Sequence, residues 1–347
     1  MPTVSICVPT FNGEGYLVEC LESIVHQTFS NFEVVIVDDC STDASLTIAN
    51  DYARRFPNFR VSQNSTNVGL AGNWNRCVQL STGEWIKFVF QDDIIAPDCL
   101  KKMVEAADSG HLLISCARDF IFERNTTVSD KKFYDKHERF IEDTYARSTT
   151  LSANEFSDCL SSNIGSNLLG EPTVTLLHKS VFETFDLFNT WLIHDADNEY
   201  WARVGTNIGT RHVPEHLASF RVHAGSTTAA NMTIRAARKK VDPLVIYHDF
   251  AFNPHYAALR RRCKATRPHI DFADEFWIRA YDTLIADKIA DMLAHGDAKT
   301  ANEIAAVFQA YPRLAAANWT SKAAATAKRR TRNARSFIQR ACAILVP

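Results

Sequence analysis

Apolar runs and helical segments alternate along the first 110 residues, and this alternation constrains the fold more than any other feature of the chain. Val4–Pro9, Phe32–Asp38 and Glu84–Phe90 have the composition of strands, and Phe32–Asp38 is apolar almost throughout, as a strand covered on both faces would be. Helical periodicity lies between them, for example at 44–56 and 72–80. The pattern predicts an α/β fold with a mostly parallel, doubly wound sheet.

Polar residues follow each of these three strands. They are Pro9-Thr10, Asp38-Asp39 and, after Gln91, Asp92-Asp93. Parallel strands end at one edge of a sheet, and ligands of doubly wound sheets bind outside that edge. We therefore expect the three clusters to form one site.

The adjacent acids Asp92 and Asp93 allow two interpretations. Carboxylate oxygens suit Mg²⁺ or Mn²⁺, which keeps some of its waters and takes its remaining ligands from a substrate diphosphate. The alternative is that the pair caps the helix expected to begin near Pro97, because acids stabilise helix N-termini. Spacing alone leaves both open.

The acids Asp38 and Asp39 are equally ambiguous. Gly13 and Gly15 follow a strand, with an acid about 20 residues further on, which imitates a dinucleotide fingerprint. The third glycine of that fingerprint is replaced by Val18, however. Two other interpretations are open. One of these carboxylates would accept a hydrogen bond from a nucleobase or ribose, or it would form an Asx turn.

The rest of the chain changes in composition at about residue 229. Residues 111–228 mix helices with strands expected at Leu112–Ala117, Thr173–His178 and His212–His223. Further on the pattern is helical and alanine-rich, and residues 304–347 carry eight Lys/Arg and no Asp/Glu. We expect three segments, 1–110, 111–228 and 229–347, of which the last is a helical, basic C-terminal extension.

Composition excludes several classes of protein. The 347 residues are 46% hydrophobic and 22% charged with a net charge of −2, so neither a disordered chain nor an overall positive field for nucleic acid is expected. Nine cysteines without CxxC spacing favour buried thiols in a reducing compartment over disulfides or zinc. No apolar run reaches the roughly 18 residues of a membrane span. We expect a cytoplasmic protein that binds no nucleic acid.

Motifs in family order across about residues 3–228 resemble glycosyltransferase family 2. They are Val4–Gly13, Leu21–Phe29, Glu33–Asp43, Asn67–Leu70, Gly83–Trp85, Phe90–Asp93, Gly170–Thr173, Asp197–Arg203 and Phe220–His223. The resemblance implies a GT-A fold, in which a nucleotide-binding half (1–110) is fused to an acceptor-binding half (111–228). It also implies an inverting enzyme that moves a sugar from a nucleotide diphosphate to an acceptor.

The resemblance carries roles onto the residues at the strand ends. The nucleoside pocket would be lined by Pro9, Thr10 and Asp39. Asp92 would face the ribose or a metal-bound water, and Asp93 would bind the divalent cation, Mn²⁺ or Mg²⁺, as the last acid of a DxD-like motif. The acid that the family often has two residues before Asp92 is Phe90 here, so metal binding would rest on Asp93 and phosphate oxygens.

Asp197 matches the catalytic base of the family. An inverting displacement needs the acceptor hydroxyl to lose its proton, and a positioned carboxylate can take it. The sequence by itself does not distinguish Asp197 from the nearby His194, Asp195 and Glu199, and the family pattern selects it.

Arg221 and His223 match an Arg-x-His element of the family. Both would offset the charge on the leaving diphosphate, and His223 would alternatively ligate the metal. Without the family pattern, an alternating Arg/His strand equally fits the polar face of a sheet.

Four further residues have roles that the sequence leaves open. Asn73 and Asn75 would hold the nucleotide or its phosphates, or serve in the core or at a cap. Glu171 and Trp191 would line the acceptor pocket, since sugars stack on aromatic faces, although a large aromatic also fits a core.

These observations predict an inverting glycosyltransferase that uses a UDP- or dTDP-sugar donor and a saccharide or lipid-linked saccharide acceptor of a bacterial surface polymer. The alternatives are a catalytically inactive sugar-nucleotide-binding protein on the same scaffold and a dinucleotide-dependent oxidoreductase. The C-terminal basic helices would bind an anionic membrane surface, which would make the protein peripheral on the inner face of the plasma membrane. A solvated terminal helix is the other interpretation of that tail, whose basic residues include Lys328, Arg329, Arg330, Arg332 and Arg335.

Overall fold

The computed structural model describes residues 2–107, 110–124, 126–233, 235–281 and 298–315. The chain forms two compact units, residues 1–229 and 230–347. The two predicted halves, 1–110 and 111–228, lie together in the first unit and share its sheet.

One mixed sheet forms the centre of the N-terminal unit. Its described strands are β1 (Val4–Thr10), β2 (Phe32–Asp38), β3 (Phe59–Gln63), β4 (Trp85–Phe88), β5 (Ile94–Ile95), β6 (Leu113–Phe122), β7 (Thr150–Leu151), β8 (Thr175–His178) and β9 (Thr210–Val222). They lie in the order β3-β2-β1-β4-β8-β6-β9-β5, and β7 pairs with β9. The strands β1 to β4 run parallel to one another, as do β6 and β9, while β8 is antiparallel between β4 and β6. The predicted α/β fold with a mostly parallel sheet is confirmed, and β8 joins its two halves.

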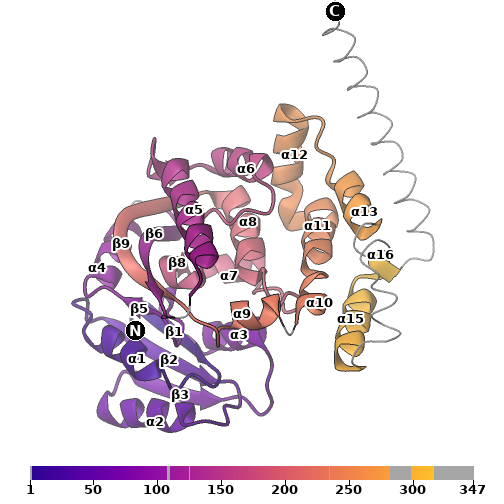
Figure 1. The fold of residues 1–347 in the computed structure, drawn as a ribbon. Coiled ribbons are helices and arrows are strands. Elements are labelled where there is room, and N and C mark those ends of the chain that lie inside the picture. The colour runs from indigo at the N-terminus through magenta and orange to yellow at the C-terminus, as the bar shows by residue number, and fades with distance from the viewer. Residues whose placement is uncertain (1, 108–109, 125, 234, 282–297, 316–347) are drawn as a thin grey trace, which may run out of the picture. The chain divides into compact units, whose positions relative to one another are not determined.

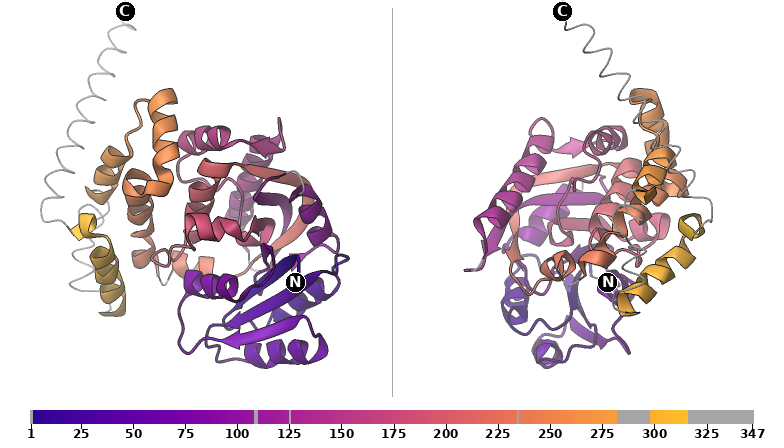
Figure 2. Two further views of the ribbon diagram at one scale, coloured as in Figure 1. Left: turned by 180° about the vertical axis from the view of Figure 1, so that it is seen from behind. Right: turned by 45° about the vertical axis from the view of Figure 1, so that its right-hand side comes forward.

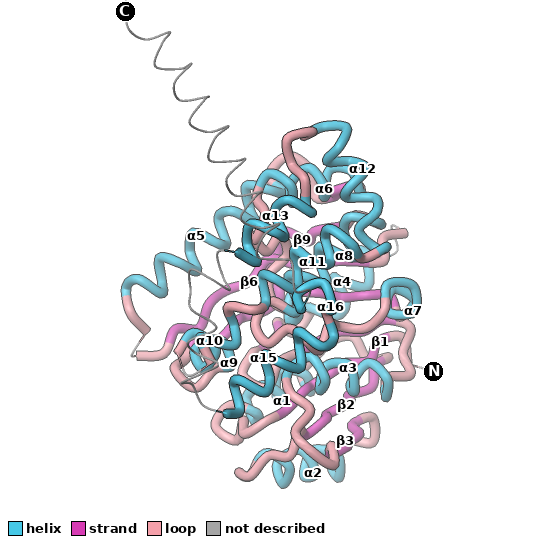
Figure 3. Tube along the Cα trace, turned by 90° about the vertical axis from the view of Figure 1, so that its right-hand side faces the viewer, coloured by secondary structure: helices cyan, strands magenta, loops and turns pink. Residues whose placement is uncertain are grey.

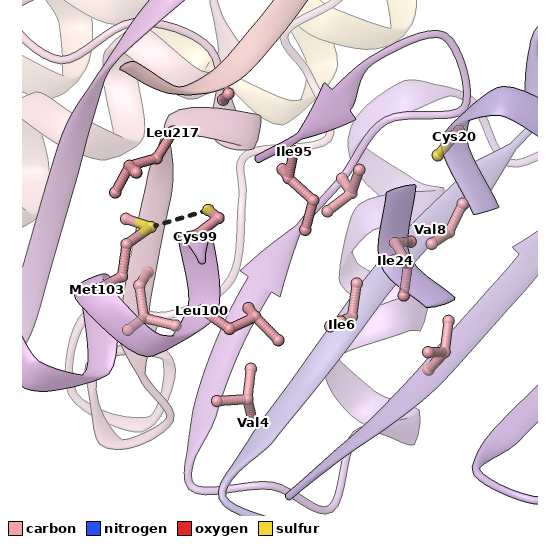
Figure 4. Packing of buried hydrophobic residues seen from close by; sticks show 14 of the residues in the cluster. Val4, Ile6, Val8, Cys20, Ile24, Ile95, Cys99, Leu100, Met103 and Leu217 are labelled. Carbon is pink, nitrogen blue, oxygen red and sulfur yellow. Dashed lines mark hydrogen bonds between the residues drawn. The ribbon is translucent and has the colours of Figure 1, made fainter. Parts of the chain in front are cut away.

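Helices cover both faces of the N-terminal strands. Those of one face are α1 (Leu17–Val25), α2 (Ser45–Arg55) and α4 (Cys99–Ala107), whereas α3 (Leu70–Leu80) packs on the other. Val4, Ile6 and Val8 of β1 are fully buried in one apolar cluster with Ile24 of α1 and Leu100 of α4 (Figure 4). Each such side chain contributes about 1.5–3 kcal/mol by leaving water. Burial from two sides explains why β2 is almost continuously apolar.

The second half of the sheet is covered by a further set of helices. They are α5 (Val128–Tyr145), α6 (Ala153–Ser162), α7 (Ser180–Phe185) and α8 (Ala196–Ile208). Capping boxes start α5 at Thr127 and α6 at Ser152, where the side chain of each N-cap residue accepts a backbone N–H of the first turn. Figure 1 shows α5 lying across β6, and Figure 2 shows the sheet from behind, with the indigo strands β1 to β3 side by side.

A short 3₁₀ helix replaces the first part of one predicted strand. The sequence predicts a strand over Thr173–His178, but β8 begins only at Thr175, because Pro172–Val174 form the 3₁₀ helix η1 with Pro172 at its start. Proline fits the first turn of a helix, where its missing N–H is not needed. The turn leaves the Thr173 side chain facing Asp93.

The C-terminal unit is helical in its described part, as predicted (Figure 3). Its elements are α10 (Ala236–Lys239), α11 (Asp242–Phe252), η2 (Pro254–Tyr256), α12 (Ala257–Thr266), α13 (Phe272–Tyr281), α15 (Ala298–Ala310) and α16 (Pro312–Ala315), while α9 (Thr227–Met232) spans the boundary of the two units. The basic tail residues Lys328, Arg329, Arg330, Arg332 and Arg335 lie outside the described residues. The predicted membrane contact therefore remains a prediction.

Two further expectations concern cysteines and membrane spans. All eight cysteines in the described ranges are free thiols, and six of them are buried. Among the helices that the structure describes, none is both long and apolar enough to cross a bilayer.

Candidate active site

The polar ends of β1, β2 and β4 meet at one edge of the sheet, as predicted. Thr10 pairs with Asp38 in register, and the backbone N–H of Asp39 donates to the carbonyl of Thr10 at 2.8 Å. Gln91, after β4, bridges to the loop after β1, since its side chain accepts from the Phe11 N–H (2.8 Å) and donates to the Phe11 carbonyl (3.0 Å). Pro9 and Thr10 are buried beneath these loops.

Asp39 fastens the loop before α3. One carboxylate oxygen accepts from Asn64 Nδ2 (2.8 Å) and the Val68 N–H (2.9 Å), and the other accepts from the Gly69 N–H (3.0 Å). Gly69 has φ +80°, a conformation that favours glycine. Asp39 is thus a buried anchor that orders residues 64–69, and the contact with a nucleoside predicted for it remains a prediction.

Asn73 and Asn75 have structural partners. Asn73 Nδ2 donates to the Val37 carbonyl (2.9 Å) and its Oδ1 accepts from Asn64 (3.0 Å), so this amide ties α3 to β2. Asn75 donates to the carbonyl of Phe188 and accepts its N–H, both at 2.9 Å. Both side chains are buried. These contacts fit the core role, and the contact with the nucleotide predicted for Asn73 remains a prediction.

The loop that carries Gly13 and Gly15 is closed by side chains from the chain itself. The N–H of Gly13 donates to Ser45 Oγ (2.8 Å), and that of Glu14 donates to Asp43 (3.0 Å). A dinucleotide fingerprint needs free backbone amides at this turn to receive a pyrophosphate. The geometry therefore argues against the oxidoreductase alternative.

Asp92 and His223 form a partly exposed pair of a carboxylate and an imidazole. His223 Nε2 lies 2.9 Å from Asp92 Oδ2, and the side chains are 7% and 19% exposed, respectively. Asp92 lies in the turn after β4, and His223 directly follows β9. The fold thus brings together two residues that are 131 positions apart in the chain.

Asp93 lies deeper than Asp92. It is fully buried, with Oδ2 accepting from Thr173 Oγ1 (2.5 Å) and Oδ1 accepting from the Arg221 N–H (3.0 Å). Burial, followed by the negative charge of Asp92, raises the pKa of Asp93 well above its usual value. Both Asp93 oxygens accept a hydrogen bond away from solvent, whereas the Asp92 side chain is 19% exposed; the cation contact predicted for Asp93 remains a prediction.

The donor set at this edge fits a hard divalent cation. Within the described ranges there is no group of three or more His, Cys, Asp or Glu side chains placed to hold a metal. Mg²⁺ and similar ions bind through one or two protein ligands and complete their shell with substrate phosphates and water. Asp92 and His223 supply that number of ligands, and a diphosphate would supply the rest.

Arg221 locks the Asp92-Asp93 turn to β9. Its Nε donates to the Asp92 carbonyl (2.9 Å), and its Nη2 lies 2.5 Å from the carboxylate of Glu19 on α1. The guanidinium carbon lies 5.1 Å from the centre of the Tyr16 ring. These contacts place Arg221 as the clamp of the turn, while its predicted contact with the diphosphate remains a prediction.

Asp197 stands on a different element, in the first turn of α8. Burial raises its pKa to about 7, an effect opposed by the Asn198 N–H and reinforced by the charges of Glu171 and Asp195. Asp197 Oδ2 also accepts from Asn167 Nδ2 at 3.2 Å. A carboxylate with a pKa near neutrality can exchange a proton with substrate at physiological pH.

Glu171 connects the two parts of the site electrostatically. Its charge raises the pKa of both Asp93 and Asp197. Its Oε2 lies 3.1 Å from Nε of the buried Arg118. Glu199, by contrast, is buried in an ion pair with Arg203 at 2.9 Å, which excludes it as the base.

Several residues of the site had no predicted role. Phe11 is an aromatic side chain 46% exposed beside the ends of β1 and β4, and Tyr16 packs against His223. Asn167 and Thr173 bind Asp197 and Asp93. Thr173 and Phe11 lie inside family motifs, whereas no local signal marks Asn167, whose contact depends on the fold. The indole of Trp191 is 37% exposed, and its role at an acceptor pocket remains a prediction.

Comparison with known proteins finds similarity to one family in the first half of the chain. Residues 5–163 match the model of Glycosyl transferase family 2. An uncharacterized protein of Mycobacterium tuberculosis is 26% identical over 234 residues, which are 67% of this chain and 72% of that protein. The putative glycosyltransferase EpsH of Bacillus subtilis is 37% identical over 37% of each chain.

A third relative is the poly(ribitol-phosphate) β-N-acetylglucosaminyltransferase TarS of Staphylococcus aureus. It is 41% identical over 114 residues, which are 32% of this chain and 20% of TarS. The chain thus spans 37% of EpsH and 20% of TarS, well under the full length of either.

Solved structures share the fold at low sequence identity. The crystal structure of TarS 1–349 has a TM-score of 0.55 and 18% identity over 90% of this chain and 92% of that one. A mannosyltransferase from Pyrobaculum calidifontis, solved with GDP-Man and Mn²⁺, has a TM-score of 0.53 and 17% identity over 94% and 84% of the two chains. Residues 5–163 are therefore similar to glycosyl transferase family 2, and the N-terminal unit has the GT-A fold.

Proposed function

We propose that the protein transfers a sugar from a nucleoside diphosphate to an acceptor hydroxyl with inversion at the anomeric carbon. The observation that carries this proposal is Asp197, a partly buried carboxylate whose pKa is raised to about 7. The charge of Glu171 acts on both Asp197 and Asp93. An inverting displacement needs a base for the acceptor hydroxyl and a separate site for the leaving diphosphate, and these two sets of residues are the proposed candidates.

In the proposed reaction, Asp197 accepts the proton of the acceptor hydroxyl as its oxygen attacks the anomeric carbon. The new glycosidic bond forms while the bond between that carbon and the diphosphate oxygen breaks. The diphosphate leaves with the bonding electron pair, and Asp197 later releases its proton to water. General-base assistance of this kind contributes roughly 10²- to 10⁴-fold to the rate.

Asp92 and His223 would hold a divalent cation, Mn²⁺ or Mg²⁺, which when bound would stabilise the charge on the leaving diphosphate. Arg221 keeps the turn that carries Asp92 in place through the Asp92 carbonyl. The mannosyltransferase with the similar fold was solved with Mn²⁺, which supports a metal-dependent reaction here.

UDP or dTDP sugars are the proposed donors. TarS, 41% identical over its matched region, has been solved with UDP and with UDP-GlcNAc. A saccharide or lipid-linked saccharide of a bacterial surface polymer is the proposed acceptor, since the name of TarS describes transfer to poly(ribitol phosphate). The β linkage in that name is what inversion of an α-linked donor would give.

A turnover assay with matched variants tests the proposal. The purified protein is supplied with UDP-, dTDP- and GDP-sugars and Mn²⁺, and nucleoside diphosphate release is measured with and without acceptor saccharides. Asp197→Asn should keep nucleotide binding and lose at least about 100-fold in turnover. Asp195→Asn is the control, because it removes a neighbouring carboxylate but keeps Asp197; it should retain turnover and only lower the pKa of Asp197.

Two outcomes would contradict the proposal. Full turnover by a folded Asp197→Asn would exclude Asp197 as the base. Binding of a sugar nucleotide without transfer or slow hydrolysis by the unaltered protein would favour the alternative, a catalytically inactive sugar-nucleotide-binding protein.

A further inference from the structure

The side chain of Asn167 has a fixed orientation beside Asp197. Its Oδ1 accepts the backbone N–H groups of Leu169 (3.1 Å) and Gly170 (2.9 Å). A flipped amide would direct its NH₂ group at two other donors, so the nitrogen must lie on the opposite side. There Nδ2 donates to the Gly170 carbonyl at 3.1 Å and to Asp197 Oδ2 at 3.2 Å.

The backbone of Asn167 is held from a second direction by His137 on α5. His137 Nε2 lies 3.0 Å from the Asn167 carbonyl, which can only accept, so Nε2 carries the proton. Nδ1 then accepts from Nη2 of Arg118 at 3.2 Å. Burial, followed by the charge of Arg118, lowers the pKa of His137, which keeps the imidazole neutral and in this tautomer.

Gly170 completes the support of the segment 167–171. Its carbonyl accepts the indole N–H of Trp201 at 2.8 Å, one turn beyond Asp197 on α8. Its φ is +109°, and a Cβ added there would lie 1.9 Å from Nη1 of Arg118, so only glycine fits. The segment thus holds the start of α8 at two points, Asp197 and Trp201.

From these contacts we propose that Asn167 is a positioning residue for Asp197, which holds the carboxylate in one orientation and favours its ionised form. The inference rests on the proposed function, in which Asp197 is the base. Glu171 and Asp195 act in the opposite direction, because their charges favour the protonated form. On the neighbouring elements, His137 and Glu138 of α5 and Arg118 of β6 lie behind the 167–171 segment.

The pH profile of turnover distinguishes this role from a merely structural one. Asn167→Ala should move the acid limb of kcat/KM upward by about 0.5 to 1 pH unit, because the carboxylate loses a donor. Its plateau kcat should fall about tenfold through loss of orientation, with the donor KM little changed. Asn167→Asp, which is nearly isosteric, should move the limb further by adding a like charge.

Asn75→Ala is the matched control. Asn75 is an asparagine whose side chain, like that of Asn167, binds backbone groups, but those belong to Phe188. This variant should lower the thermal midpoint and leave the acid limb where it is. Thermal midpoints of all variants are measured alongside, so that a folding defect in Asn167→Ala leaves Asn167→Asp to decide.

The outcomes separate this inference from the proposed function. If Asp197→Asn retains turnover, the proposed function fails. If Asp197→Asn is inactive while folded Asn167 variants keep the acid limb of the unaltered protein, only the role of Asn167 is overturned. An equal shift in Asn75→Ala would also overturn it.

Discussion

The ring of Tyr16 packs against the imidazole of His223, with the two ring centroids 4.5 Å apart. Tyr16 is fixed in turn by its hydroxyl, which donates to the carboxylate of Glu123 at the end of β6. That hydrogen bond, followed by burial, raises the pKa of Tyr16 to about 12, so the hydroxyl remains a donor at neutral pH. The imidazole that faces Asp92 therefore packs against a ring that Glu123 holds in place.

Substitution of Tyr16 should weaken metal binding. Tyr16→Ala removes the ring that orients His223, and we expect the affinity of the UDP-bound protein for Mn²⁺ to fall by about 10- to 100-fold, as for other residues that orient metal ligands. Tyr16→Phe keeps the ring and loses only the bond to Glu123, so its loss should be smaller. Calorimetric titration of Mn²⁺ measures both.

Tyr52→Phe provides the control for Tyr16→Phe. The Tyr52 hydroxyl also donates to a glutamate, Glu22, and its pKa is likewise about 12, but its ring packs on Phe56 and Phe59. Its Mn²⁺ affinity should be unchanged. Equal losses in the two Phe variants would show that the effect is not transmitted through His223.

Asp92 and Asp93 should respond differently to substitution. Asp92→Ala removes the carboxylate that faces His223 and should abolish the Mn²⁺-dependent part of UDP binding. Asp93→Asn disturbs a buried acceptor of Thr173 and Arg221, so we expect a lower thermal midpoint and Mn²⁺ affinity within about tenfold of the original. The reverse result would return the role of metal ligand to Asp93.

The ionised side chain of Asp197 should destabilise the folded protein at neutral and alkaline pH. An acid whose pKa rises on folding binds its proton more tightly in the folded state, so stability falls as pH rises from the unfolded pKa of about 4 to the folded pKa of about 7. We expect Asp197→Asn to be more stable than the original by about 2 kcal/mol at pH 8, allowing for partial exposure of the carboxyl. The difference should vanish near pH 4. Urea unfolding at the two pH values checks this, and equal stability at pH 8 would contradict it.

Phe11 should contribute to nucleotide affinity by stacking on the base. Its side chain is 46% exposed at the edge where β1 and β4 end. Stacking of a base on an aromatic ring contributes about 1–3 kcal/mol, so Phe11→Ala should weaken UDP binding about tenfold or more, while Phe11→Tyr should retain it. Phe133→Ala is the control, since Phe133 is 66% exposed on α5. Similar losses in both alanine variants would remove Phe11 from the nucleoside pocket.

Local pattern was sufficient for most of the fold and insufficient at particular turns. The apolar run Phe32–Asp38 and the helical spacing of Leu17, Leu21 and Ile24 correspond to β2 and α1 because burial decides both. Thr173 was expected in a strand but lies in a 3₁₀ turn. Proline is tolerated at the first residue of a strand and of a helix alike, so Pro172 did not distinguish the two structures. The antiparallel course of β8 between β4 and β6 has no local signal at all.

The sequence predicted which residues form the site better than it predicted what each of them does. Strand-end position and family motifs predicted that Asp92, Asp93 and His223 would matter, and the structure brings them to one edge. Which acid is buried depends on Thr173 and on the Arg221 N–H, 80 and 128 residues further along the chain. Burial and long-range hydrogen bonds of this kind are set by tertiary packing, which a motif does not contain.

The hydrogen bond between the Asp93 carboxylate and the Arg221 N–H also has a consequence for folding during translation. Domains generally fold from the N-terminus as the chain leaves the ribosome, so β1 to β4 can form first. The turn that carries Asp92 is fastened only when β9 has emerged, 128 residues after Asp93. A growing chain that has not reached residue 221 therefore lacks the hydrogen bond that fastens this turn, and under the proposed function it should not hydrolyse sugar nucleotide at that stage.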